Sequence, residues 1–479
     1  MKKSLLAISL FAVVAYAMDF AEYRAQQAQQ FGSYKEKLDK EFAKMLEQDW
    51  QEFQQMYSPS TYTEPKPSEA PVVKPEPKEK EPKLEEPKQQ RPFIIVPPIE
   101  KKPPKRVTPP KPEPETFTDK VKEFEFFLNN VSIVYDRKLP VAISGSDNEA
   151  IAKFWNEVSD KPLDGTLKSI QKIQDSFNLN DWGLYQLLYE FSNRLYSDGD
   201  SANMMAWYLF TRLGYDVKIA YNSSGTYLLA PVTHSVYQVN FYNLDGSRYY
   251  LLSENGRGTN PGQIFTYTGE YPDSTKQMSF FFDQALVFED YHMISRTLSF
   301  EYGGESYSFD TEVSKALIEF YKRFPQSDYN VYFQAPNQSY LFDSLLTQLQ
   351  PHIENRSEED AVNFLLRFVQ TAFEYKTDDE QFSYEKVMFP DETIYYPYSD
   401  CEDRTIMFRF LVDNLTTLQT VGVKYDGHFS TAVSFSSDVS GASFEHGGKR
   451  YVMADPTYIN ADVGMVMPRY KQSDFEVYN

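Results

Sequence analysis

The sequence of 479 residues predicts an α+β protein, and two kinds of pattern carry that prediction. Apolar residues recur every three or four positions in several segments, as expected for helices that bury one face. Between these segments lie runs rich in Tyr, Phe, Val and Ser, which Gly-containing turns divide into hairpins. Helices that lead into an antiparallel sheet are typical of the α+β class, and 41% hydrophobic residues are enough for two or three cores.

The first residues have the three parts of a secretory signal. Two lysines are followed by an apolar run over residues 5–14 and by Ala15-Tyr16-Ala17, a small-x-small cleavage pattern. The sequence therefore predicts a signal peptide over residues 1–17 and export to the periplasm, the cell surface or the medium. No later apolar run reaches the ~18 residues of a bilayer span, so we expect no transmembrane segment in the mature chain.

Residues 18–57 are predicted to form an amphipathic helix. Its aromatic and leucine side chains fall at steps of three or four, with Lys, Glu and Gln between them. These apolar residues are Phe31, Tyr34, Leu38, Phe42, Leu46, Trp50, Phe53 and Tyr57. Such a stripe needs a partner, which is the body of the same protein, a second copy of the chain or another exported protein.

Residues 58–115 are predicted to form an extended linker. They hold more than half of the 29 prolines of the chain, mixed with Lys and Glu, and this composition stays extended and unpacked. One apolar island, Phe93-Ile94-Ile95-Val96, is bounded by prolines. The island is either a docking motif that adds to the edge of a sheet or an idle patch.

The folded body is predicted to contain two α+β domains, over residues 116–310 and 311–479. The order of predicted elements in residues 180–253 resembles that in residues 357–455, with helices followed by a strand after Gly and a later strand after Arg. This similarity is either an internal repeat or a chance likeness of helix and strand segments.

Other elements of the body follow from the same patterns. In the first copy, helices are expected over residues 181–196 and 204–213. Strands and hairpins are expected over residues 234–310, and a helix over residues 312–324 is predicted to open the second domain because Pro325 ends it.

The second copy holds a candidate catalytic set, Cys401, His428 and Asp455. Cys401 opens a predicted helix, His428 begins an alternating run that predicts a strand, and Asp455 ends the next predicted strand. A thiol with a pKa of ~8.5 is mostly protonated at neutral pH, so an imidazole that takes its proton and a carboxylate that orients the imidazole turn it into a nucleophile. The alternative for a lone cysteine is a small buried hydrophobic residue.

The sequence around these three residues resembles the transglutaminase-like, or papain-like, cysteine enzymes over roughly residues 357–470. The matching segments are Asp-Cys-Glu-Asp-Arg from 400, Gly-His from 427 and Asp-Pro-Thr-Tyr from 455. The resemblance implies a core in which the helix that carries the cysteine packs on an antiparallel sheet. It also implies that Cys401 is the nucleophile, His428 the base and Asp455 the orienting acid of an acyl transfer.

The oxyanion of such a reaction needs hydrogen-bond donors. The backbone N–H of Cys401 lies at a helix start and is the first candidate, and Tyr396 or Tyr398 is the candidate for the second donor beside the substrate cleft. Glu402 and Asp403 suit the positive end of the predicted helix, but their charges also oppose the formation of a thiolate.

Residues 376–399 form an insertion that the first copy lacks. Aromatic and acidic residues dominate it, among them Phe382, Tyr384, Phe389, Tyr395, Tyr396, Tyr398, Asp378, Asp379, Glu380 and Asp391. Because the insertion directly precedes Cys401, we expect it to form a wall of the substrate cleft, with a simple packing loop as the alternative.

The first copy has no such catalytic set. Ser201, Thr226 and Ser253 stand at the positions of Cys401, His428 and Asp455 when the two copies are laid together. A threonine cannot act as a base near neutral pH, so the first copy is predicted to be a non-catalytic scaffold.

Several other functions are disfavoured by composition. A net charge of -21 argues against nucleic acid and anionic membrane surfaces as partners. The remaining histidines show no metal-ligand spacing, there is no cysteine pair, and no glycine-rich phosphate loop is present, so the sequence predicts neither a metal nor another cofactor.

Two functions remain. The first is an exported cysteine-dependent enzyme that acts on an amide of a protein or peptide, either as a peptidase or amidase with water as the acceptor or as a cross-linking transferase with an amine. The second is a non-catalytic binding or scaffold protein of the periplasm or cell surface whose transglutaminase-like domain is vestigial.

Overall fold

The computed structural model describes residues 65–69, 94–96, 119–141, 144–244, 246–258, 260–267, 269, 271–289 and 292–479. The predicted signal peptide and the predicted helix over residues 18–57 lie outside these ranges. The described residues belong to one compact unit, Pro65–Asn479, which mixes helices with antiparallel sheets and confirms the predicted α+β class.

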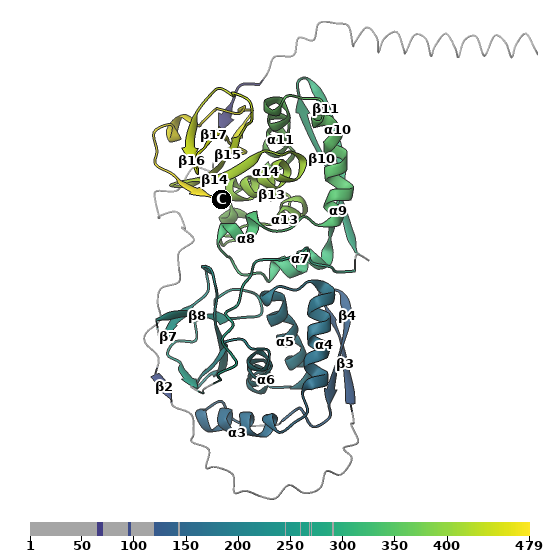
Figure 1. Cartoon of the computed structure of the whole chain (residues 1–479), viewed down its shortest axis with the longest axis vertical. Coiled ribbons are helices and arrows are strands. Elements are labelled where there is room, and N and C mark those ends of the chain that lie inside the picture. Colours follow the sequence, from purple (N-terminus) through teal and green to yellow (C-terminus); the bar gives the residue numbers. More distant parts are fainter. Residues whose placement is uncertain are drawn as a thin grey trace, which may run out of the picture. The chain divides into compact units, whose positions relative to one another are not determined.

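The first half of the body has three layers (Figure 1). Its elements are β3 (Asp119–Phe126), β4 (Asn129–Asp136), α3 (Asn148–Ser159), α4 (Asp164–Phe177), α5 (Asp181–Leu195), α6 (Gly199–Arg212), β5 (Lys218–Asn222), β6 (Gly225–Pro231), β7 (Phe241–Leu244), β8 (Ser247–Leu252) and β9 (Phe265–Tyr267). The hairpin β3–β4 packs on α4, α5 packs on α6, and α6 lies on the sheet that follows.

The second half repeats this layering. Its elements are β10 (Met293–Tyr302), β11 (Glu305–Ser314), α7 (Lys315–Lys322), α8 (Tyr329–Phe333), α9 (Ser339–Leu341), a π-helical turn (Phe342–Leu346), α10 (Thr347–Ile353), α11 (Glu358–Ala372), β12 (Glu374–Tyr375), α12 (Asp378–Gln381), α13 (Pro390–Tyr395), β13 (Tyr398–Ser399), α14 (Cys401–Leu415), β14 (Gln419–Tyr425), β15 (His428–Ser434), β16 (Ser443–His446), β17 (Lys449–Ala454), β18 (Tyr458–Ile459), a 3-10 turn (Pro468–Tyr470) and β19 (Glu476–Tyr478). The hairpin β10–β11 packs on α11, α11 packs on α14, and α14 lies on β14 and β15.

The main sheets of the two halves have the same strand order. In the first half the order is β7-β8-β6-β5-β9, and in the second half it is β16-β17-β15-β14-β19. Every pairing within these two series is antiparallel. The shared order agrees with the internal repeat that the sequence suggested.

The hairpin β10–β11 belongs to the core of the second half. Its inward residues Leu298, Phe300 and Phe309 are buried in the same cluster as the apolar face of α11. The predicted boundary at residues 310 and 311 is therefore displaced, because it cuts through β11. Alternating polar residues on the outer face of this long hairpin made it resemble the preceding strands of the first half.

Two predicted helix starts are corrected. Helix α6 begins at Gly199 rather than at residue 204, because Asp198 accepts a hydrogen bond from the Ser201 N–H at 2.8 Å and caps the first turn. Helix α7 begins at Lys315 rather than at residue 312, because the strand pairing of β11 continues to Ser314, whose side chain then caps the helix. Both errors arise at the capping residues, because Asp198 resembles part of a loop and Ser314 resembles part of the helix interior.

Two segments of the predicted linker pair with sheets of the body. β2 (Ile94–Val96) adds to the edge of the first sheet in parallel with β9, which confirms that this apolar island docks on a sheet edge. β1 (Ser68–Glu69) pairs antiparallel with β18, close to the end of β17 (Figure 1). The linker therefore contacts the body at two places among its described residues.

Candidate active site

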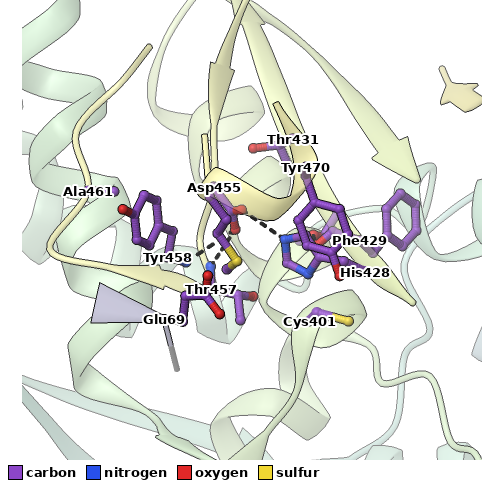
Figure 2. A network of polar contacts seen from close by, with 12 residues as sticks. Glu69, Cys401, His428, Phe429, Thr431, Asp455, Thr457, Tyr458, Ala461 and Tyr470 are labelled. Atoms are coloured by element: carbon purple, nitrogen blue, oxygen red, sulfur yellow. Dashed lines mark hydrogen bonds and ion pairs between the residues drawn. The ribbon is translucent and has the colours of Figure 1, made fainter. Parts of the chain in front are cut away.

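The structure brings His428 and Asp455 together. His428 is the first residue of β15, Asp455 follows the last residue of β17, and these strands are neighbours in the sheet. Nε2 of His428 lies 2.8 Å from Oδ2 of Asp455, and both side chains are buried (Figure 2). A buried carboxylate at this distance holds the imidazole in one orientation and one tautomer.

Asp455 is itself held by donors from the following turn. Its Oδ1 accepts from the backbone N–H of Thr457 at 2.9 Å and of Tyr458 at 3.2 Å. Its backbone carbonyl accepts from Nε2 of Gln370 on α11 at 3.0 Å. These bonds fix the carboxylate so that Oδ2 faces the imidazole.

Two tyrosines pack on the imidazole of His428. The ring of Tyr470 stacks on it at a centroid distance of 5.0 Å and an angle of 15°, and the ring of Tyr425 is nearly parallel at 6.2 Å. The Tyr470 hydroxyl donates to the carbonyl of Gly427 at 3.3 Å. Gly427 has a φ of 75° in the turn that precedes His428, a conformation that favours glycine. Rotation of the imidazole is therefore restricted by packing as well as by Asp455.

Cys401 lies beside His428 at the start of α14. The backbone N–H of Phe429, the residue after His428, donates to the sulfur of Cys401. One turn later the Thr405 hydroxyl donates to the Phe429 carbonyl at 3.2 Å, which ties α14 to β15. Figure 2 shows Cys401 below the imidazole, and since Nε2 is bonded to Asp455, Nδ1 is the ring nitrogen left for the thiol.

Arg404 holds the first turn of α14 in place. Its guanidinium is buried and donates to the carbonyls of Gln370 at 3.2 Å and Phe373 at 2.7 Å, at the end of α11, and to the Ser399 hydroxyl at 3.2 Å. These bonds satisfy a buried charge and orient the residue that carries the thiol.

The thiol of Cys401 is directed to a carboxylate in this structure. Its Sγ lies 3.0 Å from Oε2 of Glu402. Burial raises the pKa of the Cys401 thiol well above its ordinary value, and the charges of Glu402 and Asp400 raise it further, while the Phe429 N–H works in the opposite direction. The arrangement therefore favours the protonated thiol. As expected from the sequence, the charge of Glu402 opposes the formation of a thiolate.

The two tyrosines predicted as oxyanion donors contact other groups. Tyr396 packs edge-on against Phe382, with the ring centroids 5.0 Å apart, and Tyr398 lies under the Lys376 ammonium at 5.0 Å. None of these contacts involves Cys401 or His428. The sequence-based prediction that Tyr396 or Tyr398 is the second oxyanion donor stays a prediction, and these contacts do not support it.

Two other tyrosines lie close to the thiol and were not singled out in the sequence. Burial raises the pKa of the Tyr329 and Tyr375 hydroxyls, and negative groups that include Cys401 raise it further. Tyr329 packs edge-on against Phe429 at 4.6 Å, and the Arg404 guanidinium lies over the ring of Tyr375 at 5.2 Å. These hydroxyls are the better candidates for a second oxyanion donor. They come from α8 and β12, so only the fold reveals them.

A buried group of carboxylates surrounds the start of α14. Its members are Asp378, Glu385, Asp400, Glu402 and Asp403, of which all but Glu385 are buried. The nearby ammonium of Lys386 is committed to Glu392 at 2.7 Å in a buried ion pair. Asp378 and Glu385 of the insertion over residues 376–399 thus face the start of α14, whereas Asp379 and Glu380 are exposed. Asp391 instead accepts a hydrogen bond from the Tyr340 hydroxyl.

Mutual repulsion and burial disturb the titration of this group. Burial, followed by the charge of Asp403, raises the pKa of Asp378 to about 9. Burial, followed by the charge of Glu402, raises the pKa of Asp403 to about 8 and that of Glu385 to about 11. Burial also acts on Glu402, but hydrogen bonds from Glu385, Cys401 and Asp400 outweigh it and lower its pKa. Glu402 is therefore the member that keeps its charge.

The same carboxylates are placed to hold a cation. Asp378, Asp400 and Asp403 each bring one oxygen within 4.8 Å of the others, and Asp378, Glu385 and Glu402 do the same. Asp400 is only 6% exposed, and its Oδ1 has no hydrogen-bond partner. An all-oxygen set of this kind suits a hard divalent cation such as Ca²⁺. A search for His and Cys spacing in the sequence could not find it.

Comparison with protein-family models, with characterised proteins and with solved structures finds no match to this chain. Among the residues that the structure describes, no helix has both the length and the hydrophobicity that a membrane crossing requires.

Proposed function

We propose that the protein is an exported cysteine-dependent acyl-transfer enzyme of the transglutaminase-like class that acts on a protein or peptide amide. The observation that carries the proposal is the buried bond of 2.8 Å between His428 and Asp455 at the ends of adjacent strands, with Cys401 at the helix start beside them. This is the arrangement that a thiol nucleophile needs, since a base lies on one side of it and an orienting acid lies behind the base.

In the proposed reaction, Nδ1 of His428 takes the thiol proton while the sulfur forms a bond to the amide carbonyl. The carbonyl π electrons move to oxygen, and the Cys401 N–H together with a tyrosine hydroxyl stabilises the oxyanion. When the oxyanion collapses, the C–N bond breaks, the amine leaves with the proton from His428, and a thioester remains. Water then releases the acid, or a second amine forms a new amide.

The contact between Cys401 and Glu402 describes a resting state of this proposed site. The thiol donates to Glu402 at 3.0 Å, and the charge of Glu402 opposes deprotonation. Binding of a divalent cation by the carboxylates would take up that charge. The thiol would then be free to turn toward His428.

The second candidate function is a binding protein with a vestigial site. It is favoured by one observation, the contact of 3.0 Å between the Cys401 thiol and Glu402. Burial and this carboxylate raise the pKa of the thiol, whereas a catalytic thiol normally has a lowered pKa. The two candidates make opposite statements about the reactivity of Cys401.

The rate of iodoacetamide alkylation against pH separates them. Cys401 is the only cysteine of the chain, so the labelling reports on this residue alone. The intact protein, His428→Ala and the control Thr226→Ala are compared with millimolar Ca²⁺ and with chelator.

In an enzyme, the Ca²⁺-treated protein shows an apparent thiol pKa below ~8.5, which His428→Ala raises and Thr226→Ala leaves alone. Slow alkylation with an ordinary or raised titration in every sample would reject the enzyme and leave the binding protein.

A further inference from the structure

We propose that the edge of β18 is the seat of an extended peptide segment of the substrate, and that residues 65–69 of the chain itself occupy this seat as an internal strap. This proposal rests on the proposed function, because it names a binding site for the substrate of that enzyme. The strap is formed by Pro65-Lys66-Pro67-Ser68-Glu69, a described part of the linker.

The pairing of the strap is that of a peptide that adds to a sheet edge. Ser68 pairs antiparallel with Ile459 and Glu69 with Tyr458, while the side chains of β1 stay exposed. Main-chain pairing of this kind accepts many sequences, because it uses the backbone of the added strand. Two prolines keep the strap extended before it reaches β18.

The position of the seat connects it to the candidate triad. β18 begins three residues after Asp455, and the Tyr458 N–H that starts β18 is bonded to the Asp455 carboxylate at 3.2 Å. Figure 2 shows Glu69 beside Thr457, which lies between Glu69 and Cys401 in this view. A peptide in this seat therefore passes next to the turn that holds the Asp455 carboxylate.

Charge gives the seat a preference among peptides. Oε2 of Glu69 lies 3.7 Å from Nε of Arg469. The Arg469 guanidinium also lies 4.8 Å above the ring of Tyr470, which stacks on His428. An acidic residue of an extended peptide is thus recognised by an arginine that contacts the tyrosine stacked on the proposed base. Because the ion pair is exposed, it selects among peptides weakly and the backbone pairing supplies most of the binding.

A strap within the same chain competes with a peptide in solution. A tethered segment has an effective concentration on the order of a millimolar, so a free peptide must displace it. While residues 65–69 occupy the edge of β18, a weakly binding substrate cannot compete for it. Removal of the strap should therefore open it.

The experiment measures fluorescence anisotropy of a labelled peptide with the sequence of residues 61–73, added to full-length protein. All proteins carry Cys401→Ala, so the peptide is not consumed and binding is independent of catalysis. The strap is removed by Ser68→Pro combined with Glu69→Arg, two changes at exposed positions that do not disturb the core.

We expect the peptide to bind the strap variant about tenfold more tightly than the intact chain, because the tethered competitor is gone. Arg469→Glu in the strap variant should weaken binding at least threefold, and a peptide with Arg in place of its Glu69 should recover that loss. The control is Arg450→Glu on β17, which removes an ion pair with the exposed Asp438 and should leave binding unchanged.

If the peptide bound the intact chain and the strap variant with equal affinity, residues 65–69 would not compete for the site. If it bound neither protein, the edge of β18 would not be a peptide-binding site. Iodoacetamide alkylation of proteins that keep Cys401 tests the enzyme separately, because the reagent does not need β18. A reactive thiol without peptide binding rejects only the seat. Peptide binding beside an unreactive thiol rejects the enzyme and leaves β18 as a docking edge.

Discussion

The two halves of the body share one arrangement of hairpin, helices and sheet but differ in the residues where the helix meets the central strand. In both, a helix that starts with an Asp followed by a small residue lies against the first residues of a central strand. Strand register matches Gly225, one residue before the predicted Thr226, with His428, because Gly225 pairs with Asn222 and His428 pairs with Tyr425, each across a two-residue turn. The predicted absence of an imidazole in the first half thus has a structural basis.

The carboxylate of the triad is also missing in the first half. Ala454, just before Asp455, lies opposite Thr431, the third residue after His428. The third residue after Gly225 is Leu228, which lies opposite Leu252. Register therefore matches Asp455 with Ser253, as predicted. A serine carries no charge that could orient a base as a carboxylate does.

The clearest difference lies in an aspartate near each helix start, which is Asp200 in the first turn of α6 and Asp400 at the cap of α14. Asp200 is satisfied, since its Oδ1 accepts from the N–H of Thr226 at 2.6 Å and from its hydroxyl at 2.9 Å. Asp400, in the second half, has a buried oxygen without a partner among further carboxylates. Stable proteins rarely leave such groups unpaired. The first half closes its helix–strand junction with hydrogen bonds, and the second half leaves a carboxylate oxygen unpaired at its own junction.

The largest effect that this comparison predicts is on turnover. Asp455→Asn keeps the size of the side chain but removes the charge that orients His428, so hydrolysis of a pool of fluorogenic peptide amides should fall about 10³- to 10⁴-fold. Ser253→Ala, at the predicted counterpart in the first half, should leave turnover within about twofold of the original. Equal losses in both variants would mean that the halves do not differ in catalytic role.

Stability against pH should follow the carboxylates of the second half. The pKa values of Asp378 and Asp403 are raised to about 9 and about 8 in the fold, so the stabilisation from their protonated forms is complete below about pH 4 and is lost as the pH rises through these values. Without added cation, the melting temperature should fall by about 5 °C or more from pH 5 to pH 9. A flat profile in calorimetry would contradict the buried cluster.

Ca²⁺ should reverse that loss at high pH. At a concentration about 100 times the dissociation constant, a ligand of the native state adds about 2.7 kcal/mol, which is several degrees in melting temperature. Asp400→Asn should weaken the effect at least tenfold in the midpoint of a Ca²⁺ titration, because the orphan oxygen is part of the site. Asp200→Asn is the matched control and should leave that midpoint in place. Persistence of the full shift in Asp400→Asn would place the ion elsewhere.

The two aspartates should respond oppositely in the metal-free protein. Asp200→Ala removes two hydrogen bonds to Thr226 and should lower the free energy of unfolding by about 1–3 kcal/mol. Burial and the charge of Glu402 raise the pKa of Asp400, so folding at pH 8 has to protonate this carboxyl. Asp400→Asn removes that cost, and its free energy of unfolding at pH 8 should rise by about 1 kcal/mol. Chemical denaturation of both variants measures the difference. Destabilisation of similar size in both would remove the distinction between the two junctions.

Much of the second half could be predicted because its patterns are local. The start of α14 at Cys401, the strand that begins at His428 and the strand that ends before Asp455 are all confirmed. Each rests on capping or on alternation within a few residues. The closeness of His428 and Asp455 follows once these strands pair, since both residues lie at one end of the sheet.

The rest of the candidate site could not be predicted because it depends on contacts between distant segments. Tyr329, Tyr375 and Tyr470 reach the site from three different elements, and nothing local distinguishes them in a chain with 36 tyrosines. The carboxylate group combines the insertion with α14, so its charge density exists only in the fold. The hairpin β10–β11 was assigned to the wrong half because alternation shows the burial of a strand but not its partner.

The smallest effect is predicted for a thiol placed in the first half. Ser201→Cys in a Cys401→Ser background puts the only thiol in the first turn of α6, at a position that is 1% exposed. Because Gly225 and Thr226 begin the facing strand and neither carries an imidazole, the thiol should alkylate slowly, and its rate should rise with pH as for an ordinary or buried thiol. Mass spectrometry of the labelled protein gives the rate. Fast alkylation with a lowered apparent pKa would show that a helix start on this fold activates a thiol without histidine, and the role assigned to His428 in the second half would then lose its basis.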